Sequence, residues 1–234
     1  MKTITSHSTE VLSRAADQIE EYVREHPRAV LALGANDDCL RLYRELAARC
    51  MSGRLDLSGV RFFAVTEFDG LPDGDRNSCR SRLREALLAQ ADPTGERSYY
   101  LDGEQAVEYG ALIAQSGGID LAILGIGPRG RIGFNEPATP FDAKTHRQKL
   151  TKATRRELSA LFGGEDQVPD FGYTMGIHTL LGAKELLVLA LGDDKADPVF
   201  RMLYARTDSF VPAAFLQLPL QVTVYADDAA AAKL

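Results

Sequence analysis

The sequence has little cysteine and no long apolar run. Its three cysteines, Cys39, Cys50 and Cys79, form no CxxC pair, and no histidine lies at zinc-ligand spacing from them. We therefore expect reduced thiols in a cytoplasmic protein and no metal site. The longest clean apolar stretch, at 186–191, is far shorter than the roughly 20 residues that cross a bilayer. The first 18 residues hold no apolar segment typical of a secretory signal, so we expect neither export nor membrane insertion.

An excess of basic residues is also absent. Lysine and arginine number 27 against 33 aspartates and glutamates, which gives a net charge of −6. A net-negative surface argues against nucleic acid or an anionic membrane as the main partner. Hydrophobic residues make up 45% of the 234 residues, which is ordinary for a globular protein. No internal repeat or break in composition is visible, and the sequence predicts one domain over residues 1–234.

Apolar patterns of helical and strand type alternate along the chain. This alternation predicts the α/β class: a three-layer, Rossmann-like, mostly parallel sheet with helices on both faces. The segment 128–175 is rich in glycine, proline and charge, and is expected to be largely irregular. A helix is expected to begin with Asn77 as its cap. The other expected helices are 9–25, 38–51, 104–115, 175–181 and 195–204, and the expected strands are 29–33, 60–65, 121–124, 185–191 and 221–225.

Ligands of such sheets bind beyond the carboxyl ends of the strands, so the loops that follow the strands are the candidate site. The loop 125–137 is the most informative, because its glycines allow the backbone to approach a ligand closely and it also holds two arginines, an asparagine and a glutamate. On spacing alone, a glycine-rich turn with solvated charges explains it equally well. Gly125, Gly127 and Gly130 match the dinucleotide pattern G-x-G-x-x-G, but the residues that follow do not form a helical pattern. We therefore expect no dinucleotide and no other cofactor.

Four segments in one order carry a resemblance over nearly the whole chain. They are TEFDGLP from Thr66, GIGPRGRIGFNEP from Gly125, the stretch QVPDFGYTMGIHTLLGAKELLVLALGDDKA from Gln167, and FLQLPLQVTVYAD near the end. The chain resembles the glucosamine-6-phosphate deaminase (hexosamine-6-phosphate isomerase/deaminase) family. The related 6-phosphogluconolactonases fit less well, because they lack the Asn-Glu-Pro that stands at 135–137. The resemblance implies a small sugar or sugar phosphate as ligand, carbohydrate metabolism, and a possible homo-oligomer.

The acid–base residues that the resemblance implies are largely replaced. Thr66 stands where the family has the aspartate that moves the C2 proton, and Arg129 and Arg131 stand where it has an aspartate and a histidine. A threonine hydroxyl cannot act as a general base near neutral pH without an activating partner. Arginine stays protonated, so it can stabilise an oxyanion but cannot shuttle a proton. Glu67 and Glu136 are then the candidates for any proton transfer.

The phosphate loop is altered as well. The family's Gly-Gly-Thr type of loop cradles phosphate at a helix start, whereas this chain has acidic residues there, which would repel phosphate. An alternative is that Asp37 or Asp38 caps the helix. Ala160 aligns with the family's phosphate arginine, while Lys195 matches its phosphate lysine. The substrate-binding candidates lie in the loops after the strands: Gly34, Ala35, Asn36, Asp37, Gly127, Gly130, Asn135 and Lys195.

Two classes of function remain open from the sequence. The first is an amino-sugar phosphate isomerase/deaminase that forms a ketose 6-phosphate and ammonia, with Glu67 or Glu136 as the base. The second is a catalytically inactive homologue that binds or senses a sugar phosphate, which the loss of several acid–base residues favours. An enzyme re-purposed for another sugar or a sugar acid is a variant of the first, with Arg129 and Arg131 holding the acid. Lactone hydrolysis is a weaker alternative, because it relies on the missing histidine.

Overall fold

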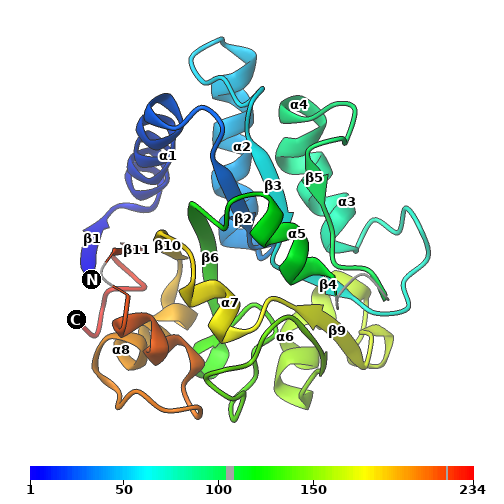
Figure 1. Ribbon diagram of the computed structural model, residues 1–234. Coiled ribbons are helices and arrows are strands. Elements are labelled where there is room, and N and C mark those ends of the chain that lie inside the picture. The colour runs from blue at the N-terminus through cyan, green and yellow to red at the C-terminus, as the bar shows by residue number, and fades with distance from the viewer. Residues whose placement is uncertain (104–107, 220) are drawn as a thin grey trace.

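A parallel sheet forms the centre of the molecule in the computed structural model, which describes residues 1–103, 108–219 and 221–234. Its strand order is β1-β11-β10-β6-β2-β3-β5, and every neighbouring pair is parallel (Figure 1). A short strand, β7, pairs antiparallel with the end of β6. The bounds are β1 Lys2–Ser6, β2 Val30–Leu33, β3 Arg61–Ala64, β5 Ser98–Tyr99, β6 Leu121–Gly127, β7 Arg131–Ile132, β10 Glu185–Ala190 and β11 Val222–Asp227. The predicted fold class is confirmed.

Helices cover both faces of this sheet because its strands are apolar on both sides. In β2, Leu31 and Leu33 pack into one core cluster and Val30 and Ala32 into the other, as alternation along a strand requires. The helices α1 Ser8–Glu25, α2 Asp37–Met51, α3 Cys79–Leu83 and α4 Ala89–Ala91 supply the first cluster, with a π-helical turn, Arg84–Leu88, joining the last two. The helices α5 Tyr109–Gln115, α7 Ile177–Leu181 and α8 Ala196–Tyr204 supply the second. No helix in the described ranges is long and apolar enough to span a membrane.

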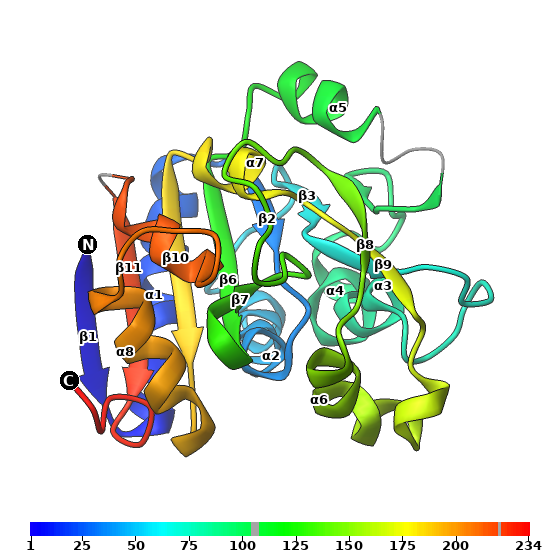
Figure 2. The same ribbon diagram turned by 90° about the horizontal axis from the view of Figure 1, so that it is seen from below.

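The segment expected to be irregular is partly regular. Strands β4 Thr66–Phe68, β9 Phe171–Thr174 and β8 His146–Lys149 form a small antiparallel sheet, and helix α6 spans Lys152–Phe162. Figure 2 shows α6 and the β8–β9 pair on the side of the molecule away from β1 and β11. The prediction of an irregular 128–175 was wrong because β8 is polar and only partly buried, so it carries no apolar strand signal.

Two helix caps differ from the prediction. The cap of α3 is Ser78 rather than Asn77, and its side chain accepts a hydrogen bond from the Ser81 N–H at 3.0 Å. The cap of α2 is Asn36, whose side chain accepts from the Cys39 N–H, so neither Asp37 nor Asp38 has that role. Of the expected helix 104–115, α5 begins at Tyr109, and residues 104–107 lie outside the described residues.

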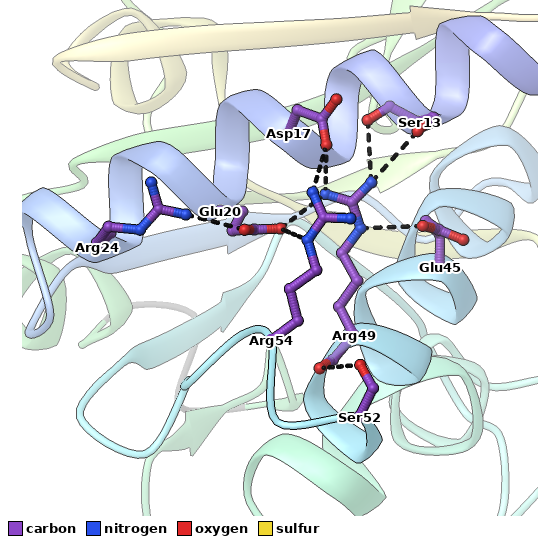
Figure 3. A network of polar contacts seen from close by, with 8 residues as sticks. All are labelled: Ser13, Asp17, Glu20, Arg24, Glu45, Arg49, Ser52 and Arg54. Carbon is purple, nitrogen blue, oxygen red and sulfur yellow. Dashed lines mark hydrogen bonds and ion pairs between the residues drawn. The ribbon is translucent and has the colours of Figure 1, made fainter.

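A network of ion pairs fastens α1 to α2 (Figure 3). At its centre is Arg49 of α2, whose side chain is only 4% exposed. Its guanidinium donates to Asp17 at 2.7 Å and Glu20 at 2.9 Å on α1, and to Glu45 at 2.9 Å on α2. Glu20 also pairs with Arg24 and Arg54. Burial acts to raise the pKa of Glu20, but the arginine contacts outweigh it and lower that pKa below its ordinary value.

Ala138 has an unfavourable backbone conformation, with φ at +78°. It lies in the turn after the Asn-Glu-Pro segment, and its N–H donates to the Ser209 carbonyl at 2.7 Å. The left-handed region costs a residue with a Cβ about 1–2 kcal/mol. Glycine avoids this cost, but its greater conformational freedom in the unfolded chain cancels part of the gain. We expect Ala138→Gly to raise the free energy of unfolding by about 0.5–1 kcal/mol in urea titrations. Ala160→Gly, in helix α6, is the control and should lose about 1 kcal/mol; a loss in both variants would contradict the expectation.

Candidate active site

The loops after β2, β3, β6 and β10 meet at one edge of the sheet, where they form a cleft with two adjoining parts. The inner hollow, of about 60 Å³, is lined by residues that include Thr66, Cys79 and Arg131. The outer hollow, of about 460 Å³, is lined by residues that include Asp38 and Lys195. The two hollows share Asn36, Arg82, Glu157 and Leu158. The cleft is therefore continuous from the polar outer part to the small inner part.

The candidates from the sequence divide among these walls. The inner hollow is lined by Gly34, Ala35, Asn36, Thr66 and Arg131, and the outer one by Asn36, Asp37 and Lys195. Glu67 lines a separate hollow with the loop that follows it. The remaining candidates do not line either hollow: Gly127 ends β6, and Arg129, Gly130, Asn135 and Glu136 follow it along the chain.

Arg131 has a fixed position in the inner hollow. Its Nη2 donates to Glu157 Oε2 at 2.7 Å, its Nη1 donates to the Gly133 carbonyl, and its side chain is 9% exposed. The guanidinium lies against Gly127, where an added Cβ would come within 2.7 Å of Nη2. Glycine at 127 is thus required for the arginine to lie there. The permanent charge of Arg131 faces the space where a ligand oxygen would bind.

Glu67 holds the start of a helix. Its Oε1 accepts the backbone N–H groups of Phe68 at 2.8 Å and Cys79 at 2.9 Å, and its Oε2 accepts that of Arg80 at 2.8 Å. Burial raises the pKa of the Glu67 carboxyl above its ordinary value, against the opposing effect of these three bonds. The carboxylate is engaged on both oxygens, which leaves it poorly placed to take a proton from a ligand in the cleft.

Glu136 holds the start of α6. Its Oε1 accepts the Thr151 N–H at 3.0 Å, and Thr151 is the cap of α6. Arg129 reaches the same threonine, with Nη2 3.3 Å from Thr151 Oγ1, although its backbone lies in the left-handed region at φ +58°. Asn135 is buried and donates to the carbonyls of Ile132 and Met175. These residues fix the loop and the helix that bound the cleft.

Three buried polar atoms of this loop have no hydrogen-bond partner among the described residues. They are Arg131 Nε, Asn135 Oδ1 and Glu136 Oε2. Burying a polar atom without a partner costs about 1–3 kcal/mol, and such atoms in a native fold are generally met by water or a ligand. Their concentration in six residues of one loop supports a binding site beside them.

Asn36 and Arg82 form the junction between the two hollows. Asn36 packs so closely on Gly125 that a Cβ there would come within 1.9 Å of its amide nitrogen. Arg82, on α3, donates to the Ala35 carbonyl at 2.9 Å and pairs with Asp37. The acidic loop after β2 is therefore partly neutralised by an arginine from another element.

Lys195 and Asp38 define the outer hollow. Lys195 Nζ lies 2.6 Å from Asp194 Oδ2, and its side chain is 12% exposed. Burial raises the pKa of Asp38 to about 6, although Lys195 and the Leu191 N–H, which donates to Asp38 at 3.2 Å, both act to lower it. The hollow thus combines two cations, Lys195 and Arg82, with carboxylates that compete for them.

The raised pKa of Asp38 gives a testable pH dependence. Its ordinary pKa is 3.8, so between pH 4 and 6 the folded state binds more protons than the unfolded state, and stability falls as pH rises through this window. We expect Asp38→Asn to be more stable than the native chain at pH 7.5, and to gain about 2–3 kcal/mol relative to it between pH 4 and 7.5. Urea titrations at both pH values measure this, with the exposed Asp228, changed to asparagine, as the control. A parallel response of Asp38→Asn and the native chain would contradict it.

Thr66 and Cys79 meet in the inner hollow, with Thr66 Oγ1 and Cys79 Sγ 3.4 Å apart. Burial raises the pKa of the Cys79 thiol well above its ordinary value, so the sulfur stays protonated. Neither side chain can act as a base there.

Sequence reasoning missed Arg82 and Glu157. Arg82 lies on α3 and Glu157 on α6, so neither belongs to a loop that directly follows a strand of the parallel sheet. Neither residue lies in a recognisable motif. Thr151 is a typical helix cap, and recognising it would have predicted a helix that carries Glu157 about two turns from its start. In the described ranges, no cluster of three or more histidine, cysteine, aspartate or glutamate side chains is placed to hold a metal ion.

Fold and site together define an α/β protein with a small-molecule cleft lined by arginine, lysine and carboxylates at the carboxyl edge of a parallel sheet. Residues 3–225 match the family described as glucosamine-6-phosphate isomerases/6-phosphogluconolactonase. The chain belongs to this family, as its motifs predicted.

Curated relatives that match along nearly the whole chain include proteins named glucosamine-6-phosphate deaminase. That of Rhodococcus jostii is 37% identical over 232 residues, which cover 97% of this chain and 89% of the relative. That of Halalkalibacterium halodurans is 35% identical over 241 residues, which cover 100% of this chain and 98% of the relative.

Solved structures match over the same length. A monomeric glucosamine-6-phosphate deaminase superposes with a TM-score of 0.95 at 31% identity, with all of both chains covered. The 6-phosphogluconolactonase of Trypanosoma brucei superposes at 0.81 with 16% identity, covering 100% of this chain and 98% of that one, and shows a shared fold alone.

Proposed function

We propose that the protein is a hexosamine-6-phosphate isomerase/deaminase that converts glucosamine or galactosamine 6-phosphate into a ketose 6-phosphate and ammonia. The observation that supports this best is the continuous cleft, which joins an outer part containing Lys195 and Arg82 to a small inner part containing Arg131. The names of relatives that match along the whole chain agree with it. A phosphate would bind Lys195 in the outer hollow, with the sugar carbons directed inward.

In this proposal the arginines stabilise charge instead of moving protons. Loss of the C2 proton from the open-chain aldehyde places negative charge on the C1 oxygen. Arg131, held in place by Glu157 and Gly133, would donate to that oxygen. The proton then returns to C1, and a proton of the amine nitrogen passes to the C1 oxygen, which leaves an imine at C2. Water hydrolyses this imine and releases ammonia. Asn36 and the backbone of Gly34 and Ala35 would position the sugar at the junction of the hollows.

A second candidate is a homologue that binds the sugar phosphate without turnover. One observation favours it: Glu67 is engaged by backbone N–H groups on both oxygens and Glu136 on one, so neither lies free on the cleft wall. Removing a general base lowers rates by about 10²–10⁴-fold.

The experiment that separates the two measures ammonia and ketose 6-phosphate formed from glucosamine and galactosamine 6-phosphates, alongside calorimetric titration of the same compounds. Turnover supports the enzyme. Binding without turnover, at an enzyme concentration that would reveal a thousandfold handicap, supports the second candidate. No binding of either compound would overturn both.

We also propose a cytoplasmic location and leave self-association as a prediction. Cys39, Cys50 and Cys79 are unpaired thiols, as in a reducing compartment. The solved relative of TM-score 0.95 is described as monomeric, so sedimentation of this chain would test whether it forms a homo-oligomer.

A further inference from the structure

We propose that Glu157 is the catalytic carboxylate that moves the C2 proton, in place of the aspartate position now held by Thr66. This inference rests on the proposed function. Glu157 lies on α6 and lines both hollows, so its side chain is at the junction of the outer and inner parts of the cleft.

Elimination among the wall residues of the inner hollow supports this assignment. Its described titratable side chains are Cys79, Arg82, Arg131 and Glu157. The two arginines stay charged, and the buried thiol stays protonated. Glu157 is the one carboxylate that the described residues place on this wall, which makes it the group there able to accept a proton.

The contacts of Glu157 suit a base. Oε2 is held by Arg131 Nη2 at 2.7 Å, whereas Oε1 accepts no hydrogen bond from a residue that the structure describes. The side chain is 26% exposed, so it faces the cleft from a partly screened position. One oxygen is oriented by the arginine and the other is available to the ligand, as proton transfer requires.

The backbone that carries Glu157 is fixed at both ends. At the start of α6, the Thr151 N–H donates to Glu136 Oε1 at 3.0 Å. At its end, the Phe162 ring packs edge-on against Phe68, with ring centroids 5.0 Å apart. The glutamate of the Asn-Glu-Pro segment therefore positions the helix, and the helix positions Glu157 over the inner hollow.

The proton transfer balances with groups on the page. Glu157 Oε1 takes the proton from C2, the C2–H electron pair forms the C1–C2 double bond, and the carbonyl pair of C1 moves to its oxygen beside Arg131. The protonated Glu157 then gives the proton to C1, while the nitrogen lone pair forms the imine at C2. That transfer regenerates the carboxylate, and a proton of the nitrogen passes to the C1 oxygen to complete its hydroxyl. Water then adds to the imine carbon, the C2 carbonyl forms and ammonia leaves.

The test follows glucosamine 6-phosphate in D₂O by proton NMR, which reports loss of the C2 proton, and by calorimetry, which reports binding. The variants are Glu157→Gln, which can still accept from Arg131, and Glu157→Asp, which keeps the charge on a shorter side chain. The control is Glu165→Gln, which removes another carboxylate paired with an arginine, Arg156, at 3.6 Å outside the cleft.

We expect Glu157→Gln to slow exchange of the C2 proton at least 100-fold, while its affinity for glucosamine 6-phosphate changes less than threefold. Glu157→Asp should retain part of the exchange rate. The control should match the native chain in both measurements. If the rate of C2 proton exchange in Glu157→Gln stays within tenfold of the native rate, the inference is overturned and the proposed function stands. Binding by the native chain without any exchange would also overturn it, and would favour the non-catalytic homologue. Absence of binding would overturn the proposed function itself. Thermal unfolding of each variant confirms that the fold is intact.

Discussion

Replacing Arg49 with methionine is expected to lower the free energy of unfolding by about 2–3 kcal/mol. The arginine is buried between α1 and α2, and its loss would leave Glu20, Asp17 and Glu45 without their shared partner. The cost falls mainly on Glu20, which is 8% exposed and keeps two other arginines as partners, whereas Asp17 and Glu45 remain in contact with water. Urea titrations at pH 7.5 would measure the change.

The matched control for Arg49 is Arg24→Met, which removes an arginine from the same carboxylate cluster. Arg24 is 66% exposed and makes a single ion pair, with Glu20. Surface pairs of this kind contribute about 0–1 kcal/mol. If the two variants lose equal free energy of unfolding, or if Arg49→Met loses less than 1 kcal/mol, the buried arginine does not stabilise the packing of α1 on α2.

Replacing Lys195 with methionine is expected to weaken binding of glucosamine 6-phosphate by about 30–100-fold. The proposed function makes this lysine the phosphate-binding cation of the outer hollow, and a hydrogen bond to a charged group is worth roughly 1.5–3 kcal/mol. Its present partner is Asp194, at 2.6 Å. Asp194→Asn should therefore tighten binding several-fold, since it removes the competing carboxylate. Calorimetric titration at pH 7.5 gives both values.

Lys184→Met is the control for Lys195. Lys184 makes the same kind of ion pair, with Asp120 at 2.6 Å, but it precedes β10 whereas Lys195 follows that strand, so the two lie at opposite ends of the sheet. Its loss should leave the affinity unchanged. A change of less than threefold in Lys195→Met, or an equal change in the control, would place the phosphate elsewhere.

The sheet could be predicted because its strands are apolar on both faces, as in Val30–Leu33 and Glu185–Ala190. The edge strand Lys2–Ser6 was missed because Ile4 is the one apolar residue in it and three of the five residues are exposed. Strand β8 and helix α6 were missed because polar residues dominate both. Apolar patterns in the sequence thus predicted the core strands. They failed for elements whose structure depends on tertiary packing instead of local composition.

The site was predictable only in part, for a similar reason. The motif at 125–137 identified the loop, because glycine is needed where Asn36 and Arg131 approach the backbone. The partner of Arg131, Glu157, comes from a helix 26 residues further along, and only the tertiary structure brings the two together. The roles of Glu67 and Glu136 as anchors of helix starts likewise depend on distances that the sequence does not contain.

The position of Glu67 has a consequence for how relatives of this chain are interpreted. Glu67 ties its loop to the start of α3, so we expect this glutamate to be needed for folding whatever reaction the neighbouring residue performs. The adjacent position, Thr66, makes no such structural bond to backbone N–H groups and is free to diverge once the chemistry changes. Search patterns that depend on this glutamate will therefore collect chains of one architecture, active and inactive alike. To distinguish active from inactive chains, one must know which residues stand at the positions of Thr66 and of Glu157, the partner of Arg131.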